Sequence, residues 1–334
     1  MALNIIALES SCDETSASII QDGKVLSNTI LSQSVHEIYG GVVPELASRA
    51  HQQHIISVVD KALEEAGISI DELSAIAFTQ GPGLLGSLLV GISFAKGLSI
   101  AKDIPLISVN HMQAHILAHF IEDPKPDFPF LCLTISGGHT QLVLVSNYLD
   151  MKVLGETRDD AVGEAFDKIG KMLGFPYPSG YLIDEHAKTG DPGKFKFPST
   201  SVPGYNYSFS GIKTAVLYFL RDKLKTDDLF IEKNLSDLCA SIQHTLIKML
   251  MEKLILCAKE NNIKEIAIAG GVAANSGIRD HLIGLSEHYD WKTYIPKLEY
   301  CTDNAAMIGI AGYYRFLEGA LCDLTVIPNA RLKF

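Results

Sequence analysis

The same order of apolar segments occurs twice along this chain, and this duplication restricts the folds that the chain can adopt. In the first half, strands are expected at residues 4–12, 16–21, 24–30, 75–78 and 106–109, with helices between the later ones. In the second half the same order returns, with strands at residues 130–135, 141–146, 151–156, 265–269 and 292–295. Three strands and then alternating helices and strands, given twice, predict an α/β protein with two lobes.

This order is that of the actin-like (ASKHA) fold, which consists of two ribonuclease-H-like domains with a cleft between the lobes. We expect residues 1–128 to form the first lobe, completed by a C-terminal helix over 305–334. Residues 129–304 would form the second lobe, with a helical insertion at about 157–235. Because ligands of α/β sheets collect beyond the carboxyl ends of the strands, corresponding loops of the two lobes should meet in the cleft.

Two histidines and a distant aspartate are candidate metal ligands. His111 and His115 are four residues apart in an expected helix, so both side chains project from the same face. Asp303 opens the corresponding helix of the second half, and a cleft would bring it to the histidines. Two imidazoles and one carboxylate suit a borderline divalent ion such as iron, zinc or manganese. Taken alone, the histidine pair is weak evidence, and an ordinary polar helix face is the more common explanation.

Two glycine-rich turns are candidate ligand sites. Ser136-Gly137-Gly138 joins two expected strands, where glycines let backbone N–H groups turn toward an anion. The segment 270–275 follows a strand and opens a helix, and Asn275 there can donate and accept hydrogen bonds. Neither turn has the Gly-Lys-[Ser/Thr] core of a phosphate-binding P-loop. Each also fits an ordinary tight turn.

A polar helix is expected over residues 159–168. Asp167 on this helix could accept hydrogen bonds from a ribose diol, and a salt-bridged surface helix is the alternative. Gly180 lies in the loop that follows, and Asp184 begins the next helical turn.

Composition sets the broad class. The chain has 334 residues, a formal net charge of −11 and six cysteines without a Cys-x-x-Cys pair, which is typical of a reduced cytoplasmic protein. The N-terminus lacks the pattern of a signal peptide, and no run of about 18 apolar residues predicts a membrane span. The acidic balance argues against unaided nucleic-acid binding. Lysines do concentrate at 168–225, as a local basic face or as ordinary solvated surface.

Several motifs together resemble one family. The chain is similar to tRNA N6-adenosine threonylcarbamoyltransferases, the bacterial TsaD or Gcp family, which is related to the Kae proteins of archaea and eukaryotes. The similarity rests on the segments at residues 9–15, 41–49, 110–112, 136–140, 163–168, 208–211, 270–275 and 301–307. The chain departs from the family pattern Tyr-Pro-Gly-Gly-Pro at 177–181, where it has Ser179 and Tyr181.

This resemblance implies transfer of a threonylcarbamoyl group from threonylcarbamoyl-adenylate to the exocyclic amine of adenosine 37, in tRNAs that read codons beginning with adenine. It implies one divalent ion per subunit, iron(II) with zinc as the alternative, held by His111, His115 and Asp303. It implies that the substrate is bound by Thr134, Ile135, Ser136, Gly137, Gly138, Asp167, Gly180, Asp184 and Asn275. It also implies two partners besides tRNA, a homologous but inactive protein of the TsaB type and a small ATPase of the TsaE type, and no membrane.

Three other classes fit parts of the sequence. An actin-like sugar or acid kinase would use Asp13 near a nucleotide phosphate but would leave the histidine pair unexplained. A zincin metalloprotease needs His-Glu-x-x-His, and Met112 occupies the glutamate position here. A non-catalytic scaffold could bind a nucleotide as a structural ligand. The general base is left open among Asp13, Glu14 and His139.

Overall fold

The computed structural model describes residues 2–200 and 202–334. The chain divides into two compact units. Unit 1 comprises Met1–Lys125, Ser146–Met151 and Pro296–Phe334, and unit 2 comprises Pro126–Val145 and Lys152–Ile295. Each unit is built on its own five-stranded sheet.

The sheet of unit 1 has the order β3-β2-β1-β4-β5. Its strands are β1 (Asn4–Glu9), β2 (Glu14–Gln21), β3 (Lys24–Ser32), β4 (Ala75–Gly81) and β5 (Leu106–Asn110). β1 pairs antiparallel with β2 and parallel with β4, and every residue of β1 is buried. A central strand buried on both faces explains why the segment from Asn4 to Leu8 is almost continuously apolar.

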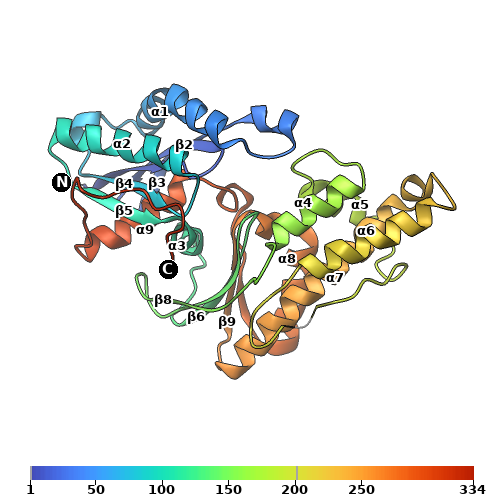
Figure 1. The fold of residues 1–334 in the computed structure, drawn as a ribbon. Coiled ribbons are helices and arrows are strands. Elements are labelled where there is room, and N and C mark those ends of the chain that lie inside the picture. Colours follow the sequence, from blue (N-terminus) through green and yellow to red (C-terminus); the bar gives the residue numbers. More distant parts are fainter. Residues whose placement is uncertain (1, 201) are drawn as a thin grey trace. The chain divides into compact units, whose positions relative to one another are not determined.

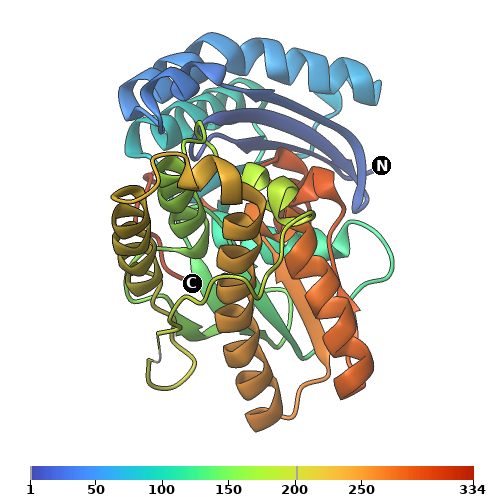
Figure 2. The same cartoon turned by 90° about the vertical axis from the view of Figure 1, so that its right-hand side faces the viewer.

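Helices cover both faces of this sheet. α1 (Pro44–Ala66) and α2 (Leu85–Lys102) pack on one face, and α3 (His111–Leu117) and α9 (Ala305–Leu317) pack on the other, as Figures 1 and 2 show. Side chains of β1 alternate between the faces: Ile6 and Leu8 join the core beneath α1 and α2, whereas Ala7 faces Gly309 of α9. An added Cβ at Gly309 would lie 2.4 Å from Ile20 Cγ1, so glycine allows this close approach.

The sheet of unit 2 repeats the topology of the first. Its order is β10-β9-β6-β7-β8, formed by β6 (Phe130–Ile135), β7 (Thr140–Val145), β8 (Met151–Glu156), β9 (Glu265–Ala269) and β10 (Lys292–Tyr294). β6 pairs antiparallel with β7 and parallel with β9, as β1 does with β2 and β4. The ten strands predicted from the sequence are therefore confirmed, in the duplicated order.

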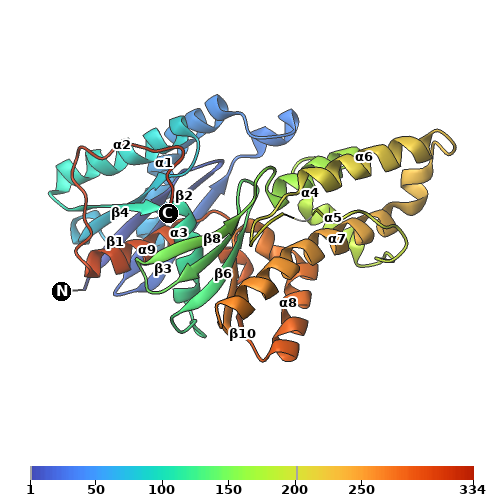
Figure 3. The same cartoon turned by 60° about the horizontal axis from the view of Figure 1, so that its bottom comes forward.

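The helices of unit 2 fall into two groups. α8 (Ser276–Tyr289) and the C-terminal part of α7 (Phe230–Glu260) run alongside the sheet (Figure 3). α4 (Val162–Met172), α5 (Gly180–Ala187) and α6 (Ser210–Leu224) lie beyond the ends of the strands. α7 contacts α5, α6 and α8, and it has a non-helical residue at Asn234.

Short 3-10 helices complete the described chain, at Ser34–Tyr39, Ile70–Glu72, Ala118–Phe120, Gly271–Ala274 and Leu298–Tyr300. After α9, the C-terminal tail returns along the sheet of unit 1. There the backbones of Cys322 and Leu106 form an isolated antiparallel β-bridge, and Asn329 N donates to Gln80 O. Within the described residues, α2 alone has the length and mean hydropathy of a membrane span. This is weak evidence, because core helices of water-soluble proteins meet the same criterion.

Candidate functional site

α3 places two imidazoles side by side in unit 1. The helix begins directly after β5, and the side chain of Asn110 caps it by accepting hydrogen bonds from Met112 N at 2.9 Å and Gln113 N at 3.3 Å. His111 and His115 lie one turn apart, with ring centroids 4.7 Å apart and ring planes at 86°. Both histidines are buried. Asn110 Nδ2 also donates to Lys333 O at 3.0 Å, so the C-terminal tail secures the start of this helix.

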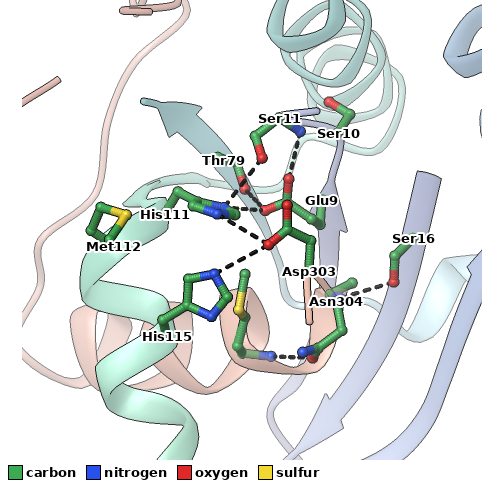
Figure 4. A network of polar contacts seen from close by, with 12 residues as sticks. Glu9, Ser10, Ser11, Ser16, Thr79, His111, Met112, His115, Asp303 and Asn304 are labelled. Carbon is green, nitrogen blue, oxygen red and sulfur yellow. Dashed lines mark hydrogen bonds and ion pairs between the residues drawn. The ribbon is translucent and has the colours of Figure 1, made fainter. Parts of the chain in front are cut away.

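Asp303 reaches the histidines from the loop before α9. Asn304 caps that helix by accepting from Met307 N at 3.0 Å, and Ala305 N donates to Ser16 Oγ at 2.8 Å. These bonds fix the backbone beside Asp303. Its Oδ1 lies 3.3 Å from His111 Nε2 and 3.1 Å from His115 Nε2 (Figure 4). The sequence argument brought Asp303 to the histidines across a cleft, whereas in the structure all three residues belong to unit 1.

These three side chains fit one divalent ion. Their ligand atoms, one from each residue, all lie within 4.8 Å of one another. Two imidazole nitrogens and a carboxylate oxygen are the donor set expected for iron, zinc or manganese. The nearby Cys301 is occupied elsewhere, since its Sγ lies 3.4 Å from Lys297 O.

A fourth residue, Glu9 at the end of β1, completes the site, and the sequence analysis did not assign it a role. Its side chain is fully buried, and Oε2 lies 3.0 Å from His111 Nδ1. Oε2 also accepts from Thr79 Oγ1 at 2.7 Å, and Oε1 accepts from Ser11 N at 2.5 Å. The signal available in the sequence was an acidic residue ending an apolar central strand, where a charge is costly unless it has partners.

The charges of this cluster perturb one another. Burial raises the pKa of Asp303, but His111 and His115 outweigh burial and hold this pKa well below its ordinary range. Burial lowers the pKa of His111, but Asp303 and Glu9 raise it well above the ordinary value. For Glu14, burial and the negative charges of Asp303, Asp13 and Glu9 raise the pKa to about 9.

The glycine-rich turns lie together at the carboxyl edge of the sheet of unit 2. Thr134 and Ile135 are the buried last residues of β6, and Ser136, Gly137 and Gly138 follow. Gly270, at the end of the neighbouring β9, approaches so closely that an added Cβ would lie 2.4 Å from Ile135 O. Its φ of +91° also favours glycine. The space beside Gly137 and Gly138 is open on the side where a side chain would stand, since an added Cβ would have no neighbour within 4 Å.

Asp167 and Gly180 are also brought together. Asp167 Oδ1 accepts hydrogen bonds from Ser179 N at 2.8 Å and Gly180 N at 3.2 Å, and Ser179 Oγ donates to Asp167 O at 3.1 Å. The carboxylate thus holds the N-terminus of α5. Ser179, which departs from the family pattern, is buried in this contact, while Tyr181 is exposed. The structure gives Asp167 a structural role next to the ligand role predicted from the sequence.

Asp184 and Asn275 meet through Gln243 of α7, a residue that the sequence analysis did not select. Gln243 donates to Asp184 Oδ1 at 3.0 Å and accepts from Asn275 Nδ2 at 2.7 Å. Asp184 also accepts from Ser276 N at 2.9 Å, at the start of α8. Asn275 Oδ1 caps the same helix by accepting from Ile278 N at 3.0 Å. The sequence could not reveal Gln243, because α7 reads as an ordinary packed helix.

The lysines at 168–225 do not form a uniformly basic face. Lys168, Lys188, Lys194, Lys213 and Lys225 each form an ion pair with an acidic residue of unit 2. This favours the solvated-surface interpretation for these five.

Comparison with known proteins shows which family the chain belongs to. Residues 24–310 match the family model of tRNA N6-adenosine threonylcarbamoyltransferase. A protein of that name from Cytophaga hutchinsonii is 59% identical over 333 residues, covering 100% of this chain and 97% of the relative. A protein of the same name from Christiangramia forsetii is 60% identical over 335 residues, which cover 99% of this chain and 98% of the relative. One from Porphyromonas gingivalis is 54% identical over 333 residues, with 98% of each covered.

Solved structures agree on the fold. A full-length HypF in the phosphate- and nucleotide-bound form superposes with a TM-score of 0.62 at 12% identity, over 94% of this chain and 46% of HypF. HypF from T. kodakarensis gives a TM-score of 0.60 at 14% identity, over 98% of this chain and 49% of that protein. The class is thus an α/β protein of actin-like fold with a candidate metal centre. The chain belongs to the tRNA N6-adenosine threonylcarbamoyltransferase family.

Proposed function

We propose that this chain is an acyltransferase that moves the threonylcarbamoyl group of threonylcarbamoyl-adenylate to the exocyclic amine of adenosine 37, in tRNAs that read codons beginning with adenine. Membership of the family supports transfer to this tRNA adenosine. The observation that carries the proposal is the convergence of His111, His115 and Asp303 in unit 1. Neither a small-molecule kinase nor a scaffold requires this buried N,N,O set.

The metal centre would hold one divalent ion per subunit, iron(II) with zinc as the alternative. His111 and His115 would bind through Nε2, the nitrogens that already face Asp303 Oδ1. When bound, a divalent ion supplies Lewis-acid polarisation of the acyl carbonyl and a template for the donor's oxygens. A zincin-type proteolysis has no support here, because Met112 takes the place of the catalytic glutamate.

The glycine-rich edge of unit 2 would bind the donor. Thr134, Ile135, Ser136, Gly137 and Gly138 would take its phosphate and acyl end. The backbone N–H groups of a glycine turn can stabilise negative charge on the leaving phosphate. Asp167, Gly180, Asp184 and Asn275 would take the nucleoside. Their convergence within unit 2 supports this assignment, since Asp167 contacts Gly180 and Asp184 is linked to Asn275 through Gln243.

The acceptor amine must lose a proton during transfer. Asp13, Glu14 and His139 are the candidates for the general base. Burial and the neighbouring Asp303, Asp13 and Glu9 raise the pKa of Glu14 in the metal-free protein. The donor is a mixed anhydride, so no covalent enzyme intermediate is required.

We propose that the protein works in the cytoplasm with a homologous inactive partner of the TsaB type and a small ATPase of the TsaE type. Exposed apolar side chains on α1 and α2, namely Ile56, Leu85, Leu89 and Ile100, support a protein partner for unit 1. The acidic net charge of −11 supports assistance with tRNA binding.

Analysis of tRNA nucleosides by mass spectrometry tests the function. Cells depleted of the protein should lose threonylcarbamoyladenosine, and the wild-type gene should restore it. In a purified reaction, preformed donor, tRNA and the partner proteins should yield the modified nucleoside only when this chain is present. Phosphorylation of a small metabolite in place of tRNA modification would support the kinase alternative.

A further inference from the structure

We propose that Glu9 is a positioning residue of the metal centre. It holds His111 with its hydrogen on Nδ1 and its Nε2 lone pair directed at the metal, and it supplies a second negative charge beside the ion. This inference rests on the metal centre proposed above. It concerns a residue that binds neither donor nor metal itself.

The hydrogen-bond partners of Glu9 place a hydrogen on His111 Nδ1. An ionised carboxylate can only accept hydrogen bonds, so each of its partners must donate. Ser11 N donates to Oε1 at 2.5 Å, and Thr79 Oγ1 donates to Oε2 at 2.7 Å. The third partner is His111 Nδ1, 3.0 Å from Oε2, which must therefore carry a hydrogen. Ser11 Oγ, 3.3 Å from the same nitrogen, can then share that hydrogen only as an acceptor.

With the Nδ1 hydrogen held by Glu9, Nε2 is the nitrogen of His111 that can give up its hydrogen and bind a metal ion. His111 Nε2 lies 3.3 Å from Asp303 Oδ1, on the side where the metal donors converge (Figure 4). A carboxylate that receives the remote N–H of a metal-bound imidazole orients the ring and raises its basicity. Strands β1 and β4 and helix α3 contribute the three residues Glu9, Thr79 and His111, so the bond is anchored on rigid elements.

Charge balance supports the same role. A fully buried carboxylate is costly unless a positive charge lies nearby. Asp303 and Glu9 together match the charge of a divalent cation at the three ligands.

The two histidines are not equivalent in this respect. His115 Nδ1 is buried, and within the described residues it has no hydrogen-bond partner. The orienting contact is thus made to one ligand only. Loss of the Glu9 charge should therefore weaken metal binding through His111. A residue that contributed only to folding would leave metal affinity unchanged in the folded protein.

The test compares two isosteric substitutions in metal-free protein. Glu9→Gln preserves shape but removes the charge. Glu65→Gln is the matched control, because Glu65 accepts one hydrogen bond from Thr29 Oγ1 at 2.8 Å in the same unit and lies outside the site. Zn²⁺ affinity is measured by competition with a chelator, and Co²⁺ absorption reports the ligand geometry. We expect Glu9→Gln to weaken Zn²⁺ binding about 10- to 100-fold and to change the Co²⁺ spectrum, with Glu65→Gln unchanged.

The outcomes are distinguishable. Wild-type Zn²⁺ affinity and Co²⁺ spectrum in a folded Glu9→Gln protein would overturn the inference while leaving the metal centre intact. Failure of the wild-type protein to bind either ion would overturn the metal centre, and this inference with it.

A second measurement needs no substitution, so it also covers a Glu9→Gln protein that fails to fold. In Zn²⁺-loaded wild-type protein with ¹⁵N-labelled histidine, NMR should show His111 protonated at Nδ1 and metal-bound at Nε2. The opposite tautomer would overturn the role of Glu9.

Discussion

Nε2 of His115 lies 3.1 Å from Oδ1 of Asp303, although 188 positions separate the two residues in the chain. The His115 side chain is 1% exposed and that of Asp303 is 22% exposed, so the contact lies mostly out of water with one side accessible. An accessible side is what a metal site needs to receive a substrate atom in addition to its protein ligands.

Removal of any one ligand should abolish transfer. His111→Ala, His115→Ala and Asp303→Ala each delete one of three donors, and two remaining donors hold a divalent ion weakly. We expect metal content to fall well below one ion per chain and modified nucleoside to fall below detection, with the far-ultraviolet circular dichroism unchanged. Metal analysis and nucleoside mass spectrometry check this. Full activity in all three variants would refute the metal mechanism.

Cys301→Ser provides the matched control for these variants. Cys301 stands two residues before Asp303, but its Sγ faces Lys297 O rather than the histidines. A hydroxyl can make the same contact to a carbonyl oxygen. Metal content and transfer activity should both be retained. A sulfur shell in X-ray absorption of the wild-type protein would contradict this ligand set.

Two substitutions at Asp167 separate its ligand role from its structural role. Asp167→Ala removes the acceptor for Ser179 N and Gly180 N, so it should cost about 1–2 kcal/mol of stability as a lost helix cap. Asp167→Asn keeps an acceptor oxygen but loses the charge. If Asp167 binds a ribose diol, both variants should weaken binding of an adenosine-containing donor analogue by about tenfold or more, as for a charged hydrogen bond of roughly 1.5–3 kcal/mol.

Calorimetry for analogue affinity and urea unfolding for stability distinguish the two effects. Unchanged affinity in a folded Asp167→Asn protein would remove Asp167 from the nucleotide site and leave it with the α5 cap alone. Metal content should be unaffected in both variants, since Asp167 belongs to unit 2.

The strand order could be predicted from the sequence because it depends on local signals. Buried parallel strands read as apolar runs, and Asp22-Gly23 marks the hairpin between β2 and β3. The two histidine ligands could also be predicted from the sequence, because histidines four residues apart on a helix share a face. Asp303 was connected to the histidines through the duplicated order, because it opens the helix of the second half that corresponds to theirs, and the resemblance of the motifs supported this connection.

The contacts around these residues could not be predicted, because they depend on where separate elements pack. Nothing local marks Glu9 as a partner of His111, 102 positions away, or Gln243 as the bridge between Asp184 and Asn275. The sequence analysis assigned the helix that follows Asp303 to the first lobe but left Asp303 itself in the second. In the structure α9 packs against β1 and β2, and Asp303 belongs to unit 1 with it. Tertiary packing decides such relationships, whereas periodicity decides the elements.

Asp159 should contribute stability that depends on pH. Its carboxylate accepts from Ser208 Oγ at 2.6 Å and from Phe209 N at 2.7 Å, at the start of α6. Burial raises the pKa of Asp159, but these hydrogen bonds and those from Ser210 lower it below the ordinary value of 3.8. The contribution is therefore complete above pH 3.8 and is lost as pH falls through the lower pKa of the folded state.

We expect Asp159→Asn to lower the free energy of unfolding at pH 7 by about 1 kcal/mol, a modest value because the carboxylate is solvent-exposed. The difference in unfolding free energy between Asp159→Asn and wild type should shrink as pH falls below 3.8. There the unfolded wild-type chain binds the proton first, and the folded carboxylate becomes protonated only at lower pH. Urea unfolding at pH 7 and at pH 3 measures this difference. An equal difference at the two pH values would show that the charge of Asp159 does not stabilise α6.

Gly163 fixes the distance between α4 and the turn predicted to bind the donor's phosphate. Its N–H donates to Ser136 O at 3.3 Å, and an added Cβ would lie 2.6 Å from Ser136 O and 2.9 Å from Gly137 Cα. Backbone atoms on both sides leave no flexible group to move aside. Gly163→Ala should therefore shift the turn or the helix, with a cost of about 1–3 kcal/mol as for other overpacked sites. Donor-analogue binding should weaken with it, while metal binding in unit 1 is retained.

Gly284→Ala is the matched control in the same unit. Gly284 lies inside α8, and an added Cβ there would meet nothing within 4 Å. Alanine should raise stability by roughly 0.4–1 kcal/mol, because it restricts the unfolded chain and favours the helix. Thermal unfolding and calorimetry on both variants provide the comparison. If Gly163→Ala binds the donor analogue as tightly as Gly284→Ala does, the Ser136–Gly138 turn does not hold the phosphate in the geometry proposed here.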